Sequence, residues 1–159
     1  MQIWRALLKG DHGAALVEFT ITLPVLLLFG LGIIEFSRVL YQYHQITTGV
    51  ADAARYLSRV QDPAGSATVA KEIAVFGQVG GSAKRVSWWN VADVTVTTRD
   101  VANPRDSITQ TRSYRGGDNI VMVKVSTTAT YTGAGLLQYL GFASGIPVTA
   151  FHEDRVIGN

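Results

Sequence analysis

The sequence contains no cysteine among its 159 residues. Disulfide bonds, thiol catalysis and cysteine-based zinc sites are therefore excluded. A domain without disulfides is held together by its hydrophobic core, and a chain of this length can form one domain of ordinary size with such a core.

The usual signs of nucleic-acid binding and of catalysis are also missing. The net charge is only +2. The Lys and Arg residues are scattered rather than gathered with aromatic residues, which argues against nucleic acid as a partner. The sequence has no P-loop, no G-x-S-x-G and no dinucleotide-binding fingerprint. It supplies no Ser/His/Asp cluster for an extracytoplasmic hydrolase either, so we expect neither an enzyme nor a cofactor.

Metal ligands are sparse as well. The three histidines are His12, His44 and His152. In a strand, alternation places His152 and Asp154 on one face and Glu153 on the other. Two ligands on one face make at best a partial metal site, and the spacing indicates no third ligand. The stretch "GGDN" lacks the repeated acidic spacing of a calcium loop, so we expect no metal site.

Charge is absent from Phe19 to Ile34, within an apolar segment that covers residues 14–34. About 20 apolar residues cross the hydrocarbon core as a helix, so this segment is predicted to span a membrane. Its large apolar side chains together favour insertion by about 3 to 7 kcal/mol, against about 3 kcal/mol for an ionised acid at the bilayer centre. Insertion is therefore favoured, but anchoring alone does not explain Glu18. The simple alternative is a carboxylate that reaches the headgroups from the end of an ordinary anchor.

Pro24 lies inside this predicted helix. It removes one backbone donor and frees the carbonyl of Thr20. The hydroxyls of Thr20 and Thr22 lie close enough in sequence to help satisfy the backbone. We expect a kink at Pro24, whose role is either purely structural or linked to assembly.

The apolar segment is not followed by the small-residue cleavage site of a secretory signal. The residues after Ile34 read "EFSRVLYQYHQ". We therefore expect the segment to stay attached to the chain. A short N-terminal stub with Arg5 and Lys9 favours an N-terminus inside and a C-terminus outside.

The helix is predicted to continue beyond the membrane as an amphipathic segment, residues 35–60. Apolar residues recur there at steps of three and four, and Asp62-Pro63 ends the pattern. One helix from Ala14 to about Ser58 is about 65 to 70 Å long. The predicted stripe consists of Phe36, Val39, Leu40, Tyr43, Ile46, Val50, Ala54 and Leu57. The small residues Gly49, Ala51, Ala53 and Ala54 either admit a second helix or, the interpretation we favour, let this helix sit closely on its own sheet.

The remaining residues, 61–159, are predicted to form an extracytoplasmic α+β domain. Its predicted elements, in chain order, are a short helix at 67–77, strands at 84–89 and 91–99, turns at 103–107 and 114–119, a strand at 120–132, a short helix at 134–142 and a last strand at 146–156. A long helix followed by a small, mainly antiparallel sheet is an α+β fold. Of Trp88 and Trp89, one is expected in the core and the other at a contact surface, with the choice left open.

These residues resemble a known family. "GAALVEF" followed by "TLPVLLLFGLGIIEFSRVLYQYHQITTGVADAARYLSR", and more loosely the ending "VTAFHEDRVIGN", are similar to the TadE-like minor pilins, or pseudopilins, of Tad/Flp-type pilus systems. The resemblance implies a pilin-like architecture and a leader peptide of residues 1–13. It also implies that a prepilin peptidase cuts between Gly13 and Ala14, and that Glu18 and Phe19 occupy the positions read in processing and assembly.

The resemblance implies a structural or assembly component of a Tad-type pilus involved in adhesion or surface attachment. Its partners would be the prepilin peptidase, other Tad pilus subunits, the inner-membrane assembly platform and the lipid membrane. The chain would cross the bacterial inner membrane once, with a cytoplasmic N-terminus and a periplasmic C-terminal domain, before any incorporation into the extracellular pilus. The alternative is a single-pass anchored periplasmic binding domain that is neither processed nor polymerised.

Overall fold

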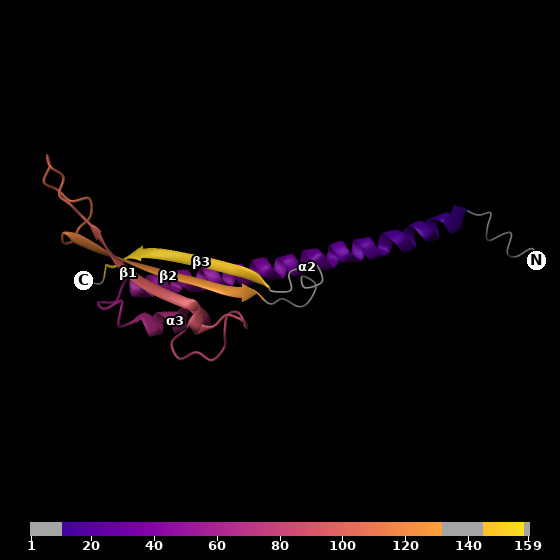
Figure 1. Cartoon of the computed structure of the whole chain (residues 1–159), viewed down its shortest axis with the longest axis horizontal. Coiled ribbons are helices and arrows are strands. Elements are labelled where there is room, and N and C mark those ends of the chain that lie inside the picture. Colours follow the sequence, from indigo (N-terminus) through magenta and orange to yellow (C-terminus); the bar gives the residue numbers. More distant parts are fainter. Residues whose placement is uncertain (1–10, 132–144, 158–159) are drawn as a thin grey trace, which may run out of the picture.

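The computed structural model describes residues 11–131 and 145–157. One long helix, α2 (Asp11–Leu57), forms the long axis of the molecule. The C-terminal half of α2 lies along a three-stranded sheet, and its N-terminal half extends away from the domain (Figure 1). This is the α+β arrangement that the sequence predicted, with α2 beginning three residues before Ala14.

The elements after α2 are α3 (Ala67–Phe76), the short 3-10 helix η1 (Val91–Asp93), β1 (Val94–Ala102), β2 (Asn119–Tyr131) and β3 (Ile146–Arg155). The sheet is antiparallel, with the strand order β1-β2-β3. In the central strand the side chains of alternate residues from Val123 to Tyr131 face the helices and are buried. The second helix, α3, ends at Gly77, whose φ of 77° is the left-handed conformation that glycine adopts without strain.

The predicted strand at 84–89 is wrong, because these residues form turns. The N–H of Trp89 donates to the carbonyl of Val86 at 3.2 Å, which closes a tight turn. Both of these side chains are buried. The apolar pattern therefore reflects burial from a loop, which a pattern of residue types does not distinguish from a strand.

The two predicted turns both lie in the connection between β1 and β2. The first turn falls at residues 107–109, slightly later than predicted. In the second, Gly116 has a positive φ of 137°. The helix predicted at 134–142 lies outside the described residues.

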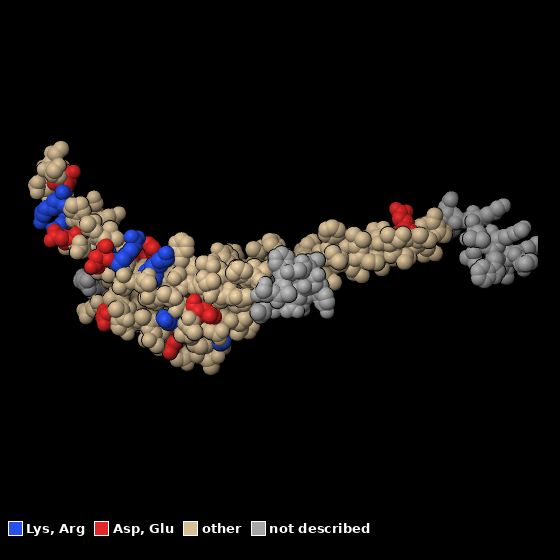
Figure 2. Space-filling view, in the orientation of Figure 1, with Lys and Arg blue, Asp and Glu red and all other residues tan. Residues whose placement is uncertain are grey.

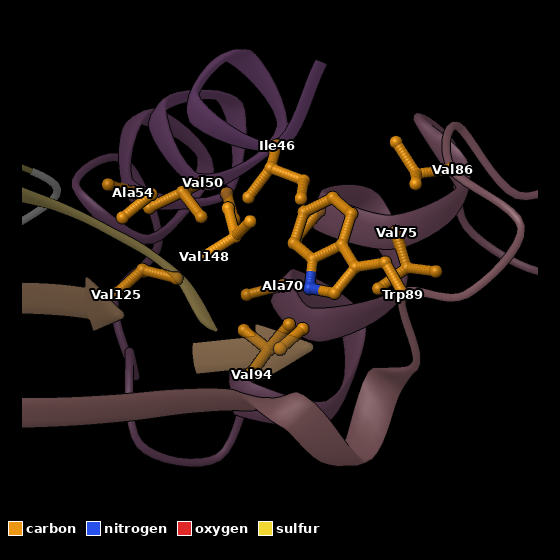
Figure 3. Close-up of a cluster of buried hydrophobic side chains, with 14 of the residues drawn as sticks. Ile46, Val50, Ala54, Ala70, Val75, Val86, Trp89, Val94, Val125 and Val148 are labelled. Atoms are coloured by element: carbon orange, nitrogen blue, oxygen red, sulfur yellow. The ribbon is translucent and has the colours of Figure 1, made fainter. Parts of the chain in front are cut away.

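The core lies between the two helices and one face of the sheet (Figure 3). Trp89 occupies its centre with no exposed surface. Its Nε1–H donates to the Thr127 hydroxyl at 2.9 Å, and that hydroxyl donates to the Asp93 carbonyl at 2.9 Å. Trp88 is only partly buried. The question left open by the sequence is thus settled: Trp89 is the core residue.

Gly49 packs against α3 rather than against the sheet. A Cβ at this position would overlap the backbone carbonyl oxygen of Ala74 and lie 2.9 Å from the Trp89 ring. The favoured interpretation of the small residues is therefore corrected at Gly49. The close partner is a second helix of the same chain, and the small side chain permits its approach.

Replacing Gly49 with valine is expected to lower the free energy of unfolding by about 2 to 3 kcal/mol, because the added atoms overlap a packed backbone. Thermal unfolding of the full chain in detergent, followed by circular dichroism, measures this loss. Gly32→Ala is the matched control, since no atom lies within 4 Å of a Cβ built there. Equal midpoints for the two variants would contradict the helix contact.

Candidate membrane and assembly segment

The N-terminal part of α2 stands free of the domain. The chain has one described helix long and apolar enough to cross a membrane, and none of its most apolar 18-residue window is buried. Figure 2 shows charged side chains over the domain, whereas the projecting helix carries one acidic patch near its N-terminal end. An apolar helix that its own domain does not cover has the length and composition of a membrane anchor.

Glu18 is the single charged residue between positions 13 and 34. Its side chain is exposed, and no described residue forms an ion pair or hydrogen bond with it. Ala14 and Glu18 are four residues apart on one helix, so they lie on the same face one turn apart. The Gly13–Ala14 peptide bond lies inside α2, and Phe19 is 59% exposed. The predicted processing residues are therefore all accessible on one exposed stretch of helix.

The helix continues through Pro24. The Thr20 hydroxyl donates to the Leu16 carbonyl at 2.7 Å, and the Ser37 hydroxyl donates to the Ile33 carbonyl at 2.8 Å. Such bonds satisfy hydroxyl groups within the helix, as an apolar environment requires. The Thr20 hydroxyl is therefore hydrogen-bonded to the carbonyl of Leu16.

The predicted stripe on α2 is wrong at three of the four positions in its first half, whereas the fourth, Val39, packs against the core as predicted. Phe36, Leu40 and Tyr43 remain 64%, 46% and 41% exposed. The side of α2 that meets the domain in this region carries Glu35 and Gln42 instead. Phe36 and Leu40 therefore point outward whereas Glu35 and Gln42 point inward, so exposed apolar side chains continue past Ile34, alongside the exposed Arg38.

The inward polar residues are held by aromatic side chains of the domain. Glu35 is 7% exposed, and its Oε1 accepts a hydrogen bond of 2.7 Å from the Tyr131 hydroxyl. The Nε1–H of Trp88 donates to Gln42 Oε1 at 2.9 Å. The Trp88 and Tyr131 rings meet edge to face with centroids 5.8 Å apart. This junction fixes the helix to the end of β2 where the exposed segment begins.

This junction was not predicted from the sequence. The signal in the sequence that could have indicated it is Glu35, a carboxylate directly after the apolar run. Its partner Tyr131 lies 96 positions away in the sequence. The pKa of Tyr131 is raised to about 12 by burial and by the hydrogen bond to Glu35. The tyrosine therefore stays protonated and donates its hydrogen bond throughout the physiological range.

Tyr131→Phe is expected to lower the free energy of unfolding by about 1 to 3 kcal/mol at pH 7, because the buried Glu35 carboxylate loses a donor. The pKa of Tyr131 is about 10 in the unfolded chain and is raised to about 12 in the folded chain. The protonated tyrosine therefore stabilises the folded wild type fully below about pH 10, and this contribution is lost as the pH rises towards 12. The difference between wild type and variant should therefore shrink from pH 7 to pH 12. Urea unfolding at both pH values measures it. Tyr114→Phe, at an exposed hydroxyl, is the control, and a pH-independent difference would contradict the explanation.

On β3 the titratable residues lie as strand alternation predicted, with His152 and Asp154 on one face and Glu153 on the other. Glu153 contacts Arg99 at 3.0 Å and Lys124 at 3.8 Å, while His152 Nε2 lies 3.7 Å from Asp154 Oδ2. Within residues 11–131 and 145–157, no group of three His, Cys, Asp or Glu residues could hold a metal ion. His44 is exposed on α2.

A comparison with known protein families finds a match to the N-terminal helical segment. The model of the family described as "TadE-like protein" matches residues 13–55. The resemblance drawn from the N-terminal motif is thereby confirmed over these residues. The match covers the exposed apolar segment and nearly all of the half of α2 that packs on the domain. Neither the curated proteins nor the solved structures contain a match to this chain.

Proposed function

We propose that this chain is a minor pilin, or pseudopilin, that serves as a structural or assembly component of a Tad-type pilus involved in adhesion or surface attachment. The observation that carries the proposal is the exposed apolar helix with one carboxylate, Glu18, a single turn after Ala14. The TadE-like match over residues 13–55 supports it.

A prepilin peptidase cuts between Gly13 and Ala14 on the cytoplasmic side of the inner membrane. Residues 14–34 then hold the chain in the bilayer, with the domain of residues 61–159 in the periplasm. Cleavage leaves a free amine on Ala14, on the helix face that carries Glu18. The positive amine and the carboxylate are opposite charges at the edge of the membrane.

Glu18 sets the axial register of the subunit in a filament. When α2 leaves lipid and packs among the helices of other pilus subunits, its carboxylate pairs with the amine of a neighbouring subunit or with its own. In surroundings of low dielectric an unpaired charge costs several kcal/mol, so one axial position is favoured over its neighbours. Glu35 lies 17 residues further along, about 25 Å away, where Tyr131 fixes the helix to the domain. The position set at Glu18 is thereby transmitted to the domain.

The length of the exposed apolar surface favours assembly over a simple tether. Exposed large apolar side chains run from Leu16 to Tyr43, with the exposed Arg38 among them, which is about 40 Å of helix against about 30 Å of hydrocarbon. An anchor does not need the outward-facing Phe36 and Leu40, which lie beyond the predicted span, whereas packing of helices in a filament buries them. The alternative, an unprocessed anchored binding domain, gives this extension no role.

Recovery of the chain in sheared filaments tests the proposal. Wild-type chain is expected in both the membrane and the sheared pilus fraction. The Leu40→Gln variant is expected to reach the membrane normally but to fall at least about fivefold in the sheared fraction, since it loses about 1 kcal/mol or more of buried apolar contact per interface. Val79→Gln, at an exposed residue of the domain, is the control. A chain confined to the membrane in cells that make filaments would favour the tether instead.

A further inference from the structure

A groove of about 340 Å³ lies at the end of the domain that is distant from the exposed apolar part of α2. Its walls come from the connection between β1 and β2, from the start of β2 and from the end of β3 (Figure 1). The Val156 N–H donates to the Val121 carbonyl at 2.9 Å, so the pairing of β2 with β3 continues into the groove. The described lining contains two arginines, Arg115 and Arg155, and no acidic residue. The groove is therefore a site of positive charge.

The two arginines of the groove have no anionic partner among the described residues. Elsewhere in residues 61–159 the arginines are bonded within the chain, Arg85, Arg99 and Arg112 to carboxylates and Arg105 to a carbonyl. Within residues 11–131 and 145–157, Arg115 and Arg155 form neither an ion pair nor a hydrogen bond through their guanidinium groups. Arg155 is partly buried, and its guanidinium carbon lies 5.3 Å from the centre of the Tyr114 ring. A guanidinium that has lost part of its hydration without gaining an anion favours an incoming carboxylate, which it can bind through two parallel hydrogen bonds.

The rest of the lining offers hydrogen-bonding groups and aliphatic groups in similar measure. No atom lies within 4 Å of a Cβ built at Gly116, and the nearest atom to one at Gly117 is 4.0 Å away, so the backbone is open to the groove there. Asn119 adds a side-chain amide to the lining. Ile120 and Ile157 line the groove as well, and Ile157 is 60% exposed. A ligand that fits this lining carries a negative charge and an aliphatic group close together.

The groove is also remote from the membrane that holds the helix. The Ile157 N–H donates to the Ser58 carbonyl at 2.7 Å, so the groove adjoins the C-terminal end of α2. From Ile34, where the predicted span ends, to Leu57 the helix is about 35 Å long. Lipid headgroup charges are screened over about 8 Å at physiological salt. With residues 14–34 in the bilayer, the ligand is therefore not a headgroup of the same membrane.

We propose that the groove binds an acidic peptide segment of another protein. In the bound state an Asp or Glu carboxylate of that protein faces Arg115 and Arg155, and a neighbouring aliphatic side chain lies against Ile157. A small inorganic anion would use only the two arginines and leave the aliphatic wall exposed. An anionic saccharide packs its rings best on aromatic faces, and no described lining residue is aromatic. A charge beside an aliphatic group within one short segment is the combination that a peptide supplies.

Binding of a short peptide to the full chain tests this assignment. The chain is labelled at an added tag, held in neutral detergent and titrated with the peptide Glu-Ile-Glu, whose termini are blocked. Microscale thermophoresis follows the binding. A dissociation constant of about 0.1 mM or below is expected for a ligand of this size. The peptide Gln-Ile-Gln has the same shape without the charge and is expected to bind at least about tenfold more weakly.

Matched variants connect the binding to the groove. Arg115→Gln and Arg155→Gln are each expected to raise the dissociation constant for Glu-Ile-Glu at least about fivefold, because each removes one charged donor. Lys71→Gln removes the same charge from α3, outside the lining of the groove, and is expected to change the constant by less than about twofold. Ile157→Gln replaces an exposed aliphatic side chain and is expected to raise the constant about threefold. Circular dichroism shows that each variant is folded before it is titrated.

The proposal is overturned if Glu-Ile-Glu does not bind at about 10 mM. It is also overturned if Lys71→Gln weakens binding as much as the two arginine variants, which would leave only general attraction between opposite charges. An unchanged constant for Ile157→Gln would overturn it by reducing the groove to a site for small anions. Tighter binding of trigalacturonate than of the peptide would overturn it by assigning the groove to anionic saccharides. None of these outcomes depends on processing at Gly13 or on filaments, so failure here is distinct from failure of the proposed function.

Discussion

Replacing Glu18 with alanine is expected to remove the chain from filaments while leaving its amount in the membrane unchanged or higher. The substitution removes the only charged side chain between residues 13 and 34, so insertion becomes easier. In the filament the Ala14 amine would lose its counter-charge. Breaking a buried ion pair costs about 3 to 5 kcal/mol, which corresponds to a loss of more than about a hundredfold in incorporation. Quantitative immunoblots of sheared filaments and of membranes measure both effects.

Matched substitutions separate the charge from the shape of the side chain. Glu18→Gln keeps the shape and removes the charge, so it should behave like the alanine variant. Leu23→Ile keeps an apolar side chain of the same volume on the same exposed helix, so it should leave incorporation far closer to wild type than either Glu18 variant, since a volume-conserving apolar exchange costs less than about 1.5 kcal/mol. Normal incorporation of the two Glu18 variants would show that the carboxylate only reaches towards the headgroups.

Trp89→Ala is expected to cause the largest loss of stability in the domain. The side chain is fully buried, and its Nε1–H bonds the Thr127 hydroxyl at 2.9 Å. Removing a buried tryptophan costs about 3 to 5 kcal/mol, a large part of the about 5 to 15 kcal/mol by which a domain is stable. We expect the midpoint of thermal unfolding to fall by more than about 12 °C.

Circular dichroism of the full chain in detergent measures this change without relying on tryptophan fluorescence. The amount of chain extracted from membranes should not change, because the apolar part of α2 does not contact Trp89. Val79→Ala, at a residue 59% exposed, is the control and should shift the midpoint by only about 2 to 3 °C. A similar small shift for Trp89→Ala would mean that the core is not organised around this ring.

Local patterns in the sequence were enough to predict most of the regular elements, although the strand predicted at 91–99 begins as the 3-10 helix η1 and continues as β1 to Ala102. The apolar run and helical spacing predicted α2 to within three residues at its start and one at its end. Alternation predicted β2, and the glycine after Phe76 predicted the end of α3. In each case the signal is a repeat or a stop residue within one segment. Such features reflect backbone geometry directly.

The failures all involve contacts between distant segments. The stretch 84–89 was predicted as a strand but forms turns, from which Val86 and Trp89 are buried in the core. The outward direction of Phe36 and Leu40 depends on where the domain meets α2, which helical spacing leaves undetermined. The bond between Glu35 and Tyr131 joins residues too far apart for any local pattern.

The assembly segment was visible in the sequence for a different reason. Glu18 interrupts an apolar run at a cost in free energy, so it stands out without knowledge of the fold. The spacing from Ala14 to Glu18 fixes their common helix face. What the structure adds is that no described part of the domain covers this segment, and that the apolar surface continues to Tyr43. A new charge on Ala14 would therefore be available to another subunit.

The mature N-terminus is the most direct test of the whole account. Mass spectrometry of the chain recovered from membranes should show a polypeptide that begins at Ala14 in wild-type cells and retains Gly13 and the preceding residues when the prepilin peptidase is deleted. A chain that still carries its leader in wild-type cells would contradict the account, because no amine would then exist for Glu18 to meet.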